Sequence, residues 1–328
     1  MRTVNFDNVL DVTLRDGGYL NQWQFSQPEI DHTLAFLYKI GIRKVEVGFL
    51  RSPENTTSSV NGCPSDFLAR IKTLYPDLEL VCMLNPAEKN WRSAIAGKLP
   101  YISLIRMTCT SELIQPALEI AHELHQQSNN LKVSLNLICV SSYSKEKISY
   151  LLDKIASSRD IDIIYFADSR GALHPCEVES IVSLAQKICD QPLGFHAHNT
   201  LGNAVENSNR AFACGCEWID ATLNGFGLAG GNTSLGDYLE HNELLPPEWE
   251  TKTEITTFCD QYLSLEHPCL EDRKMYEMLA SKNVDPVWSN QLVKKYQNKI
   301  NEHLMRLPRA YYKRIEEVFA HQVQSIAR

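Results

Sequence analysis

Eight short apolar runs alternating with longer amphipathic stretches predict an α/β fold, a TIM (β/α)8 barrel followed by a helical C-terminal extension. The runs are rich in β-branched residues and start about every 20–35 residues, the spacing of repeated β/α units. Their nearly continuous apolar character is typical of parallel strands covered by helices. No glycine-rich dinucleotide fingerprint follows the first run, which favours a closed barrel over an open doubly wound sheet.

The predicted strands are residues 9–14, 44–50, 78–84, 101–107, 132–138, 161–167, 193–198 and 217–223. Between them, apolar residues recur at three- and four-residue spacing, most clearly at 28–42 and 111–127, and predict helices. We assign residues 1–240 to the barrel domain and residues 241–328 to the extension. In the extension, 250–328 contains no convincing strand, and Pro246 and Pro247 mark the junction.

Composition excludes several classes of partner. The formal net charge is −8, and no long run of lysine or arginine is present, so a nucleic-acid partner is not expected. No apolar stretch approaches the roughly 18 residues of a membrane span, and the N-terminus does not resemble a signal peptide. We therefore expect no membrane partner, a cytoplasmic location, and ten reduced cysteines.

The first predicted strand ends in a charged, glycine-containing turn, Arg15-Asp16-Gly17-Gly18. The C-terminal ends of the strands form the active site of a TIM barrel, and this turn lies at such an end. An ion pair that merely closes the loop is the alternative interpretation, because most charged loop residues are solvated.

The seventh predicted strand ends in His196-Ala197-His198. Alternation along a strand puts both imidazoles on one face, where they can converge on one metal ion. Only strand 8 separates strand 7 from strand 1 in a closed barrel, so Asp16 can add an oxygen ligand. Ordinary packing of the two histidines is the alternative. After strand 8, a loop with four glycines ends at Asn232, which could reach the metal or orient a ligand.

Together these segments resemble the DRE-TIM metallolyase superfamily. The matching stretches are DVTLRDGG (11–18), VEVGF (45–49), DSRGALHP (168–175), FHAHNTLGNAVENS (195–208) and IDATLNGFGLAGGN (219–232). The short glycine loop is most similar to that of 4-hydroxy-2-oxovalerate aldolase-like pyruvate aldolases, and the pattern is also similar to hydroxymethylglutaryl-CoA lyase. The resemblance implies a divalent metal, Mn²⁺ or Mg²⁺, held by Asp16, His196, His198 and Asn232.

The same resemblance implies that Arg15 stabilises an enolate oxygen and that Glu46 holds Arg15 in place. One position departs from the aldolase pattern, because Tyr19 stands where those enzymes place a catalytic histidine. We predict Tyr19 as the group that moves the proton, with His174 as the alternative.

Further residues are predicted to contact the substrate. Arg106 and Asn136, near the ends of strands 4 and 5, are suited to a carboxylate or a hydroxyl, although a solvated Arg106 is the alternative. Asp168, Asn199 and Gly230 lie in the matched motifs and complete the predicted set.

The sequence therefore predicts reversible retro-aldol cleavage of a 4-hydroxy-2-oxo acid to pyruvate, or a close 2-oxo acid, and an aldehyde. Two alternatives stay open: a Claisen-type acyl-CoA lyase or synthase on the same barrel, and a non-catalytic metal-binding regulatory subunit. By the same resemblance, the C-terminal helices could form a lid, a homodimer contact or a contact with a partner dehydrogenase.

Overall fold

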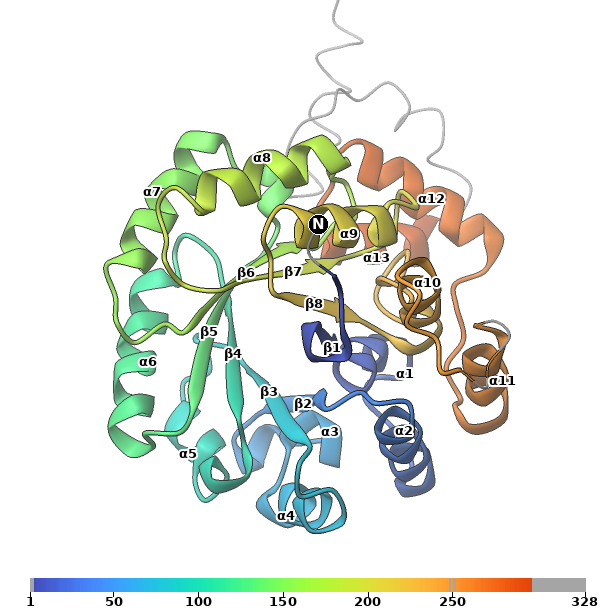
Figure 1. Cartoon of the computed structure of the whole chain (residues 1–328), viewed down its shortest axis with the longest axis horizontal. Helices are drawn as coiled ribbons and strands as arrows, with labels where there is room; N and C mark the ends of the chain where they lie inside the picture. The colour runs from blue at the N-terminus through green and yellow to red at the C-terminus, as the bar shows by residue number, and fades with distance from the viewer. Residues whose placement is uncertain (1–2, 248, 250–251, 297–328) are drawn as a thin grey trace, which may run out of the picture.

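The computed structural model describes residues 3–247, 249 and 252–296, and it contains a closed barrel of eight parallel strands in sequential order (Figure 1). The strands are β1 (Val9–Asp11), β2 (Lys44–Leu50), β3 (Glu79–Leu84), β4 (Leu104–Cys109), β5 (Lys132–Leu137), β6 (Ile163–Asp168), β7 (Leu193–Ala197) and β8 (Trp218–Ala221). β1 pairs with both β2 and β8, which closes the barrel. The predicted fold class is confirmed.

Helices surround the barrel on its outer face (Figure 1). They are α2 (Gln27–Lys39), α3 (Ser59–Gly62), α4 (Ser65–Leu74), α5 (Trp91–Ile95), α6 (Ile114–Gln127), α7 (Lys145–Ala156), α8 (Pro175–Ala185), α9 (Ala204–Ala213) and α10 (Leu235–His241). The short α1 (Gly18–Asn21) instead follows the turn after β1. The sequence at the start of α2 shows why this helix forms and packs there. Ser26 and Glu29 form a capping box, and the helix then buries Ile30, Leu34 and Leu37 against the barrel.

Two strands differ from their predicted bounds by three residues at one end. The first ends at Asp11 rather than residue 14, because the Asp11 carboxylate accepts hydrogen bonds from the backbone N–H and the hydroxyl of Thr13. The chain then enters a π-helical turn, Thr13–Gly17, which carries the charged motif. The fourth starts at Leu104 rather than residue 101, because Leu99–Tyr101 forms a 3-10 turn containing Pro100.

The described part of the extension is helical and comprises α11 (Thr253–Tyr262), α12 (Leu270–Ser281) and α13 (Pro286–Tyr296). α11 lies against α2, where Phe258 stacks on Phe36 with ring centroids 4.0 Å apart. Met275, Tyr276 and Leu279 of α12 pack with Ala229 of the glycine loop in a separate apolar cluster. The extension therefore packs on the loop after β8. Its division from the barrel at residue 240 stays a prediction, and residues 297–328 of the predicted helical extension lie outside the described residues.

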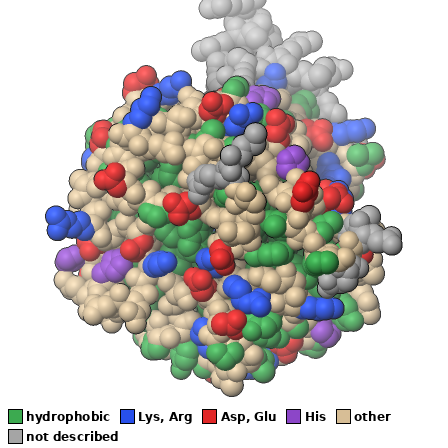
Figure 2. All heavy atoms as spheres, in the orientation of Figure 1, with side chains coloured by type: hydrophobic (Ala, Val, Ile, Leu, Met, Phe, Trp, Pro, Cys, Tyr) green, Lys and Arg blue, Asp and Glu red, His purple; other side chains and the backbone are tan. Residues whose placement is uncertain are grey.

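Acidic and basic side chains are intermingled over the face shown in Figure 2. In the described part of the chain, no helix has both the length and the apolar character that crossing a bilayer requires. All ten cysteines are free thiols.

Candidate metal centre and active-site cavity

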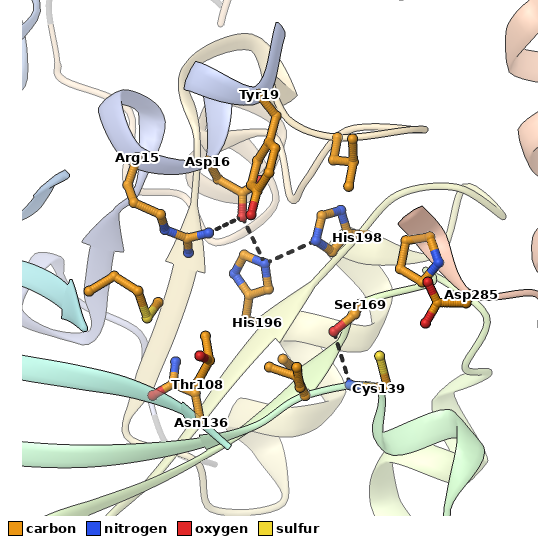
Figure 3. A pocket seen from close by; sticks show the side chains of 15 residues that line it. Arg15, Asp16, Tyr19, Thr108, Asn136, Cys139, Ser169, His196, His198 and Asp285 are labelled. Carbon is orange, nitrogen blue, oxygen red and sulfur yellow. Dashed lines mark hydrogen bonds and ion pairs between the residues drawn. The ribbon is translucent and has the colours of Figure 1, made fainter. Parts of the chain in front are cut away.

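Three side chains converge at the C-terminal mouth of the barrel (Figure 3). Asp16 comes from the π-helical turn after β1, His196 from β7, and His198 from the residue after β7 ends. One ligand atom from each lies within 4.8 Å of the other two. His196 Nε2 is 3.3 Å from Asp16 Oδ2 and 3.2 Å from His198 Nε2. All three residues are buried, and these distances suit one shared cation.

The orientation of His196 is set by a carboxylate on the neighbouring strand. Asp220 of β8 lies 2.9 Å from His196 Nδ1 and accepts its hydrogen, which leaves Nε2 facing Asp16. Burial lowers the pKa of His196, but hydrogen bonds to Asp16 and Asp220 outweigh burial and raise it overall. Burial lowers the pKa of His198 to about 4, so His198 is neutral at physiological pH. A neutral imidazole is the form that binds a metal.

Asn232 lies beside this triad. It forms an antiparallel bridge with His198, and its Nδ2 donates to the carbonyl oxygen of Phe226 at 2.9 Å. Within the described residues, its buried Oδ1 has no hydrogen-bond partner, and neither does Asp16 Oδ1. A Cβ added at Gly227 would lie 2.0 Å from Asn232 Nδ2 and 3.3 Å from Asp16 Oδ1, so both side chains crowd onto this glycine. Two buried acceptor oxygens without donors fit a cation bound between these residues.

Arg15 lies between two carboxylates. Its Nη1 donates to Asp16 Oδ2 and its Nε to Glu46 Oε2, both at 2.5 Å. Burial lowers the pKa of Arg15, but the charges of Glu46 and Asp16 raise it by more than burial lowers it, so the guanidinium stays charged. The same ion pairing overcomes burial and holds the pKa of Asp16 well below its usual range. Arg15 therefore carries a fixed positive charge beside the ligands, as the resemblance implies.

A cavity of about 220 Å³ opens beside these residues. It is lined by Arg15, Asp16, Tyr19, Met83, Thr108, Asn136, Ile138, Cys139, Ala167, Ser169, His196, His198, Leu228, Asp285 and Pro286. Seven strands or their following loops and the extension all contribute to this wall. A cavity of this size suits a small organic molecule rather than a polymer.

Tyr19 lies over the cavity and points its phenol toward Asp16 and the histidines (Figure 3). Its ring packs edge-on against Trp23 with centroids 4.7 Å apart, and Trp23 Nε1 donates to the carbonyl oxygen of Arg15 at 2.7 Å. A Cβ at Gly18 would lie 2.1 Å from Trp23, so this close approach requires glycine. Tyr19 as a whole is 42% exposed, but desolvation of its phenol and the nearby Asp16 carboxylate raise the pKa of Tyr19 above its usual value.

The predicted substrate contacts divide into two groups. Asn136 lines the cavity. Arg106 does not line it, and lies fully buried with its guanidinium paired to Asp220 at 2.6 Å and to Glu46 at 3.4 Å. The structure therefore places Arg106 in an internal ion-pair network rather than on the cavity wall.

Four other predicted residues also lie off the cavity wall. His174 is exposed at the start of α8. The Asp168 carboxylate accepts hydrogen bonds from the backbone N–H groups of Ala172 and Leu173, and so shapes its own loop. Asn199 Oδ1 accepts from the N–H of Ala204 at 3.1 Å, and a Cβ at Gly230 would lie 2.4 Å from the Thr200 backbone.

Sequence reasoning missed Asp220, Thr108, Ser169 and Asp285. Asp220 carried a signal, because it is a carboxylate flanked by apolar residues in the middle of the eighth strand. Asp285 carried none, because it comes from the extension and reaches the cavity only through the packing of α12 and α13.

A triad able to hold a metal ion, with an adjacent arginine at the mouth of a TIM barrel, is typical of barrel metalloenzymes. The particular family follows from the sequence: the chain belongs to the HMGL-like family, whose sequence pattern matches residues 8–261. This is the DRE-TIM group of divalent-metal-dependent lyases and aldolases, and the predicted resemblance is confirmed.

Curated relatives include a 4-hydroxy-2-oxovalerate aldolase of Pelotomaculum thermopropionicum, 27% identical over 232 residues that cover 69% of this chain and 67% of that protein. An oxaloacetate decarboxylase of Mycobacterium tuberculosis is 26% identical, with 69% and 67% covered. Among solved structures, the N-terminal domain of a candidate aldolase from Bacteroides vulgatus matches with a TM-score of 0.76 and 23% identity, covering 90% of this chain and 99% of that domain. This last likeness concerns the fold.

Proposed function

We propose that the protein catalyses reversible retro-aldol cleavage of a 4-hydroxy-2-oxo acid to pyruvate, or a close 2-oxo acid, and an aldehyde, with Mn²⁺ or Mg²⁺ as its cofactor. The observation that carries the proposal is the convergence of the ligand triad and Arg15 on one small cavity. The curated relatives named as 4-hydroxy-2-oxovalerate aldolases support the same reaction class.

The chemistry requires stabilisation of an enolate. Cleavage of the bond β to the ketone leaves an electron pair that becomes an enolate of the 2-oxo acid. A divalent cation at the triad supplies positive charge that stabilises this negative charge as it develops. Arg15 adds a second positive charge that is already oriented by Glu46 and needs no reorganisation during the reaction.

Proton transfer from the 4-hydroxyl is assigned to Tyr19, which would accept the proton as a phenolate; a divalent cation bound at the triad would lower the pKa of the phenol and so supply that form. Its phenol points into the cavity toward Asp16, and Trp23 braces its ring. Tyr19 lines the cavity whereas His174, at the start of α8, does not, which favours Tyr19 over His174. In the condensation direction, the same phenol returns the proton to the new alkoxide.

The test is pyruvate release, coupled to lactate dehydrogenase, from a panel of 4-hydroxy-2-oxo acids. Pyruvate release is expected with Mn²⁺ or Mg²⁺. It should be lost after treatment with EDTA and should return when the metal is restored. The aldehyde is measured in parallel with alcohol dehydrogenase, because oxaloacetate decarboxylation would yield pyruvate without an aldehyde. Turnover of acyl-CoA substrates alone would move the assignment to the Claisen branch. Metal binding without turnover on any substrate would favour a regulatory subunit.

A further inference from the structure

Six buried side chains from five strand regions form one closed ring of ion pairs and hydrogen bonds. The ring consists of Arg15, Asp16, His196, Asp220, Arg106 and Glu46. In this order the six contacts measure 2.5, 3.3, 2.9, 2.6, 3.4 and 2.5 Å. Asp16 and His196 are candidate metal ligands, and Arg15 is the candidate enolate-stabilising group.

Arg106 does not line the cavity, and in the ring it stands opposite Asp16, three contacts away in either direction. Its Nη2 binds Asp220, which orients His196, and its Nη1 faces Glu46, which orients Arg15. Arg106 therefore connects Asp220, the partner of His196, with Glu46, the partner of Arg15. Its side chain is 0% exposed and packs over the Tyr165 ring, with Cζ 4.2 Å from the ring centroid.

From this geometry we infer that Arg106 is a positioning residue: by holding Asp220 and Glu46 together, it orients both His196 for the metal and Arg15 for the enolate. The planar guanidinium suits this task because two separate nitrogens can meet two carboxylates in a rigid fork. A lysine has one point charge and cannot hold both carboxylates in the same way. Asn136 continues the network toward the cavity, because with its amide oxygen facing Arg106 it accepts hydrogen bonds from Nε at 3.1 Å and from Nη2 at 2.7 Å.

A direct role for Arg106 in binding the substrate carboxylate predicts a different result. In that case substitution would raise KM for the 2-oxo acid and leave metal affinity unchanged. A positioning role predicts weaker metal binding and a larger loss in kcat than in substrate affinity, because both orienting carboxylates lose their shared partner. Outer partners of metal ligands commonly change metal affinity by about 10- to 100-fold.

The experiment measures Mn²⁺ affinity by isothermal titration calorimetry in the full-length parent, Arg106→Lys and Arg106→Met. Both variants are expected to bind Mn²⁺ about 10- to 100-fold more weakly. Lys98→Met is the matched control, because Lys98 is also a buried cation, donates to the carbonyl oxygen of Gly62 at 2.7 Å, and lies outside the ring. Its Mn²⁺ affinity is expected to equal that of the parent. Arg106→Lys keeps the charge and carries the test if Arg106→Met does not fold.

A second measurement tests whether Arg106 acts through Asp220. If it does, Arg106→Lys combined with Asp220→Asn should bind Mn²⁺ about as weakly as Asp220→Asn alone, because the link is already broken. If the double variant instead loses Mn²⁺ affinity by the product of the two single-variant factors, Arg106 does not act through Asp220.

The kinetic part of the test rests on the proposed function. Steady-state kinetics of retro-aldol cleavage should show kcat falling more than KM rises in Arg106→Lys. Parent-like Mn²⁺ affinity in an active Arg106→Lys enzyme would overturn the inference and leave the proposed function standing. A parent protein that binds neither Mn²⁺ nor Mg²⁺ would overturn both.

Discussion

Glu46→Gln isolates the electrostatic role of the carboxylate that holds Arg15. Glu46 is fully buried on β2, 2.5 Å from Arg15 Nε and 3.4 Å from Arg106 Nη1. Glutamine keeps the size of the side chain but removes the charge that faces two guanidinium groups. Removing one partner of a buried ion pair costs about 3–5 kcal/mol. Asp16 and Asp220 still pair with the two arginines, so we expect the lower end, about 3 kcal/mol.

Two assays measure the outcome. Urea unfolding reports the loss of stability, and metal-dependent pyruvate release reports the effect of a less firmly oriented Arg15. We expect kcat/KM to fall about 100-fold, equivalent to about 2.7 kcal/mol of transition-state stabilisation. The matched control is Glu79→Gln on the adjacent strand β3. The Glu79 side chain is 42% exposed and lies 3.8 Å from Lys44 Nζ, so its loss should cost under about 1 kcal/mol. Parent-like stability and turnover in Glu46→Gln would show that Arg15 is oriented without this carboxylate.

Three further substitutions test other parts of the site. Tyr19→Phe should lower kcat by about 100-fold or more if its phenol moves the proton, while an unchanged kcat would remove that assignment. Burial raises the pKa of Asp11 to about 7, with Asp220 and Glu46 adding to the shift. Between about pH 4 and pH 7 the unfolded chain is ionised at Asp11 while the folded chain retains the proton, so stability falls as pH rises, and above pH 7 this contribution is constant. This destabilising effect of Asp11 reaches at most about 4 kcal/mol. In urea titrations, the free energy of unfolding of Asp11→Asn should therefore rise relative to that of the parent from pH 4 to pH 7. A difference between the two proteins that does not change with pH would contradict this reasoning. Asp285 places a carboxylate on the cavity wall and pairs at 3.5 Å with the buried Arg170, which does not line that wall; Arg15 is the sole lysine or arginine among the described lining residues. In the condensation direction, butanal should therefore be used at least about tenfold better than succinic semialdehyde, and Asp285→Asn should narrow the gap; equal use of both aldehydes by the parent would refute this role for the charge.

The barrel and the ligand set were predictable from local patterns. Parallel strands in an α/β protein are apolar over their whole length, and the eight runs stood out from the helical periodicity between them. Asp16, His196 and His198 were predictable because the sequence puts polar residues at strand ends, and a closed barrel brings all such ends to one mouth. The shortened first strand was not predictable, because the hydrogen bonds from Thr13 to Asp11 compete with strand pairing.

By itself, the sequence determined the fold class and the convergence of Asp16, His196 and His198, because these depend on periodicity and on motifs that lie at strand ends. The Arg15–Glu46 pair was implied by the family resemblance. The tertiary structure alone decided which polar residues face the cavity. Arg106 sits inside the barrel because Asp220 and Glu46 from other strands compensate its charge, and that compensation is invisible in any one segment. Asp285 reaches the cavity because α12 and α13 pack their apolar residues beside the glycine loop, a contact between segments far apart in the chain. Long-range packing and charge pairing, unlike periodicity, are properties of the assembled barrel.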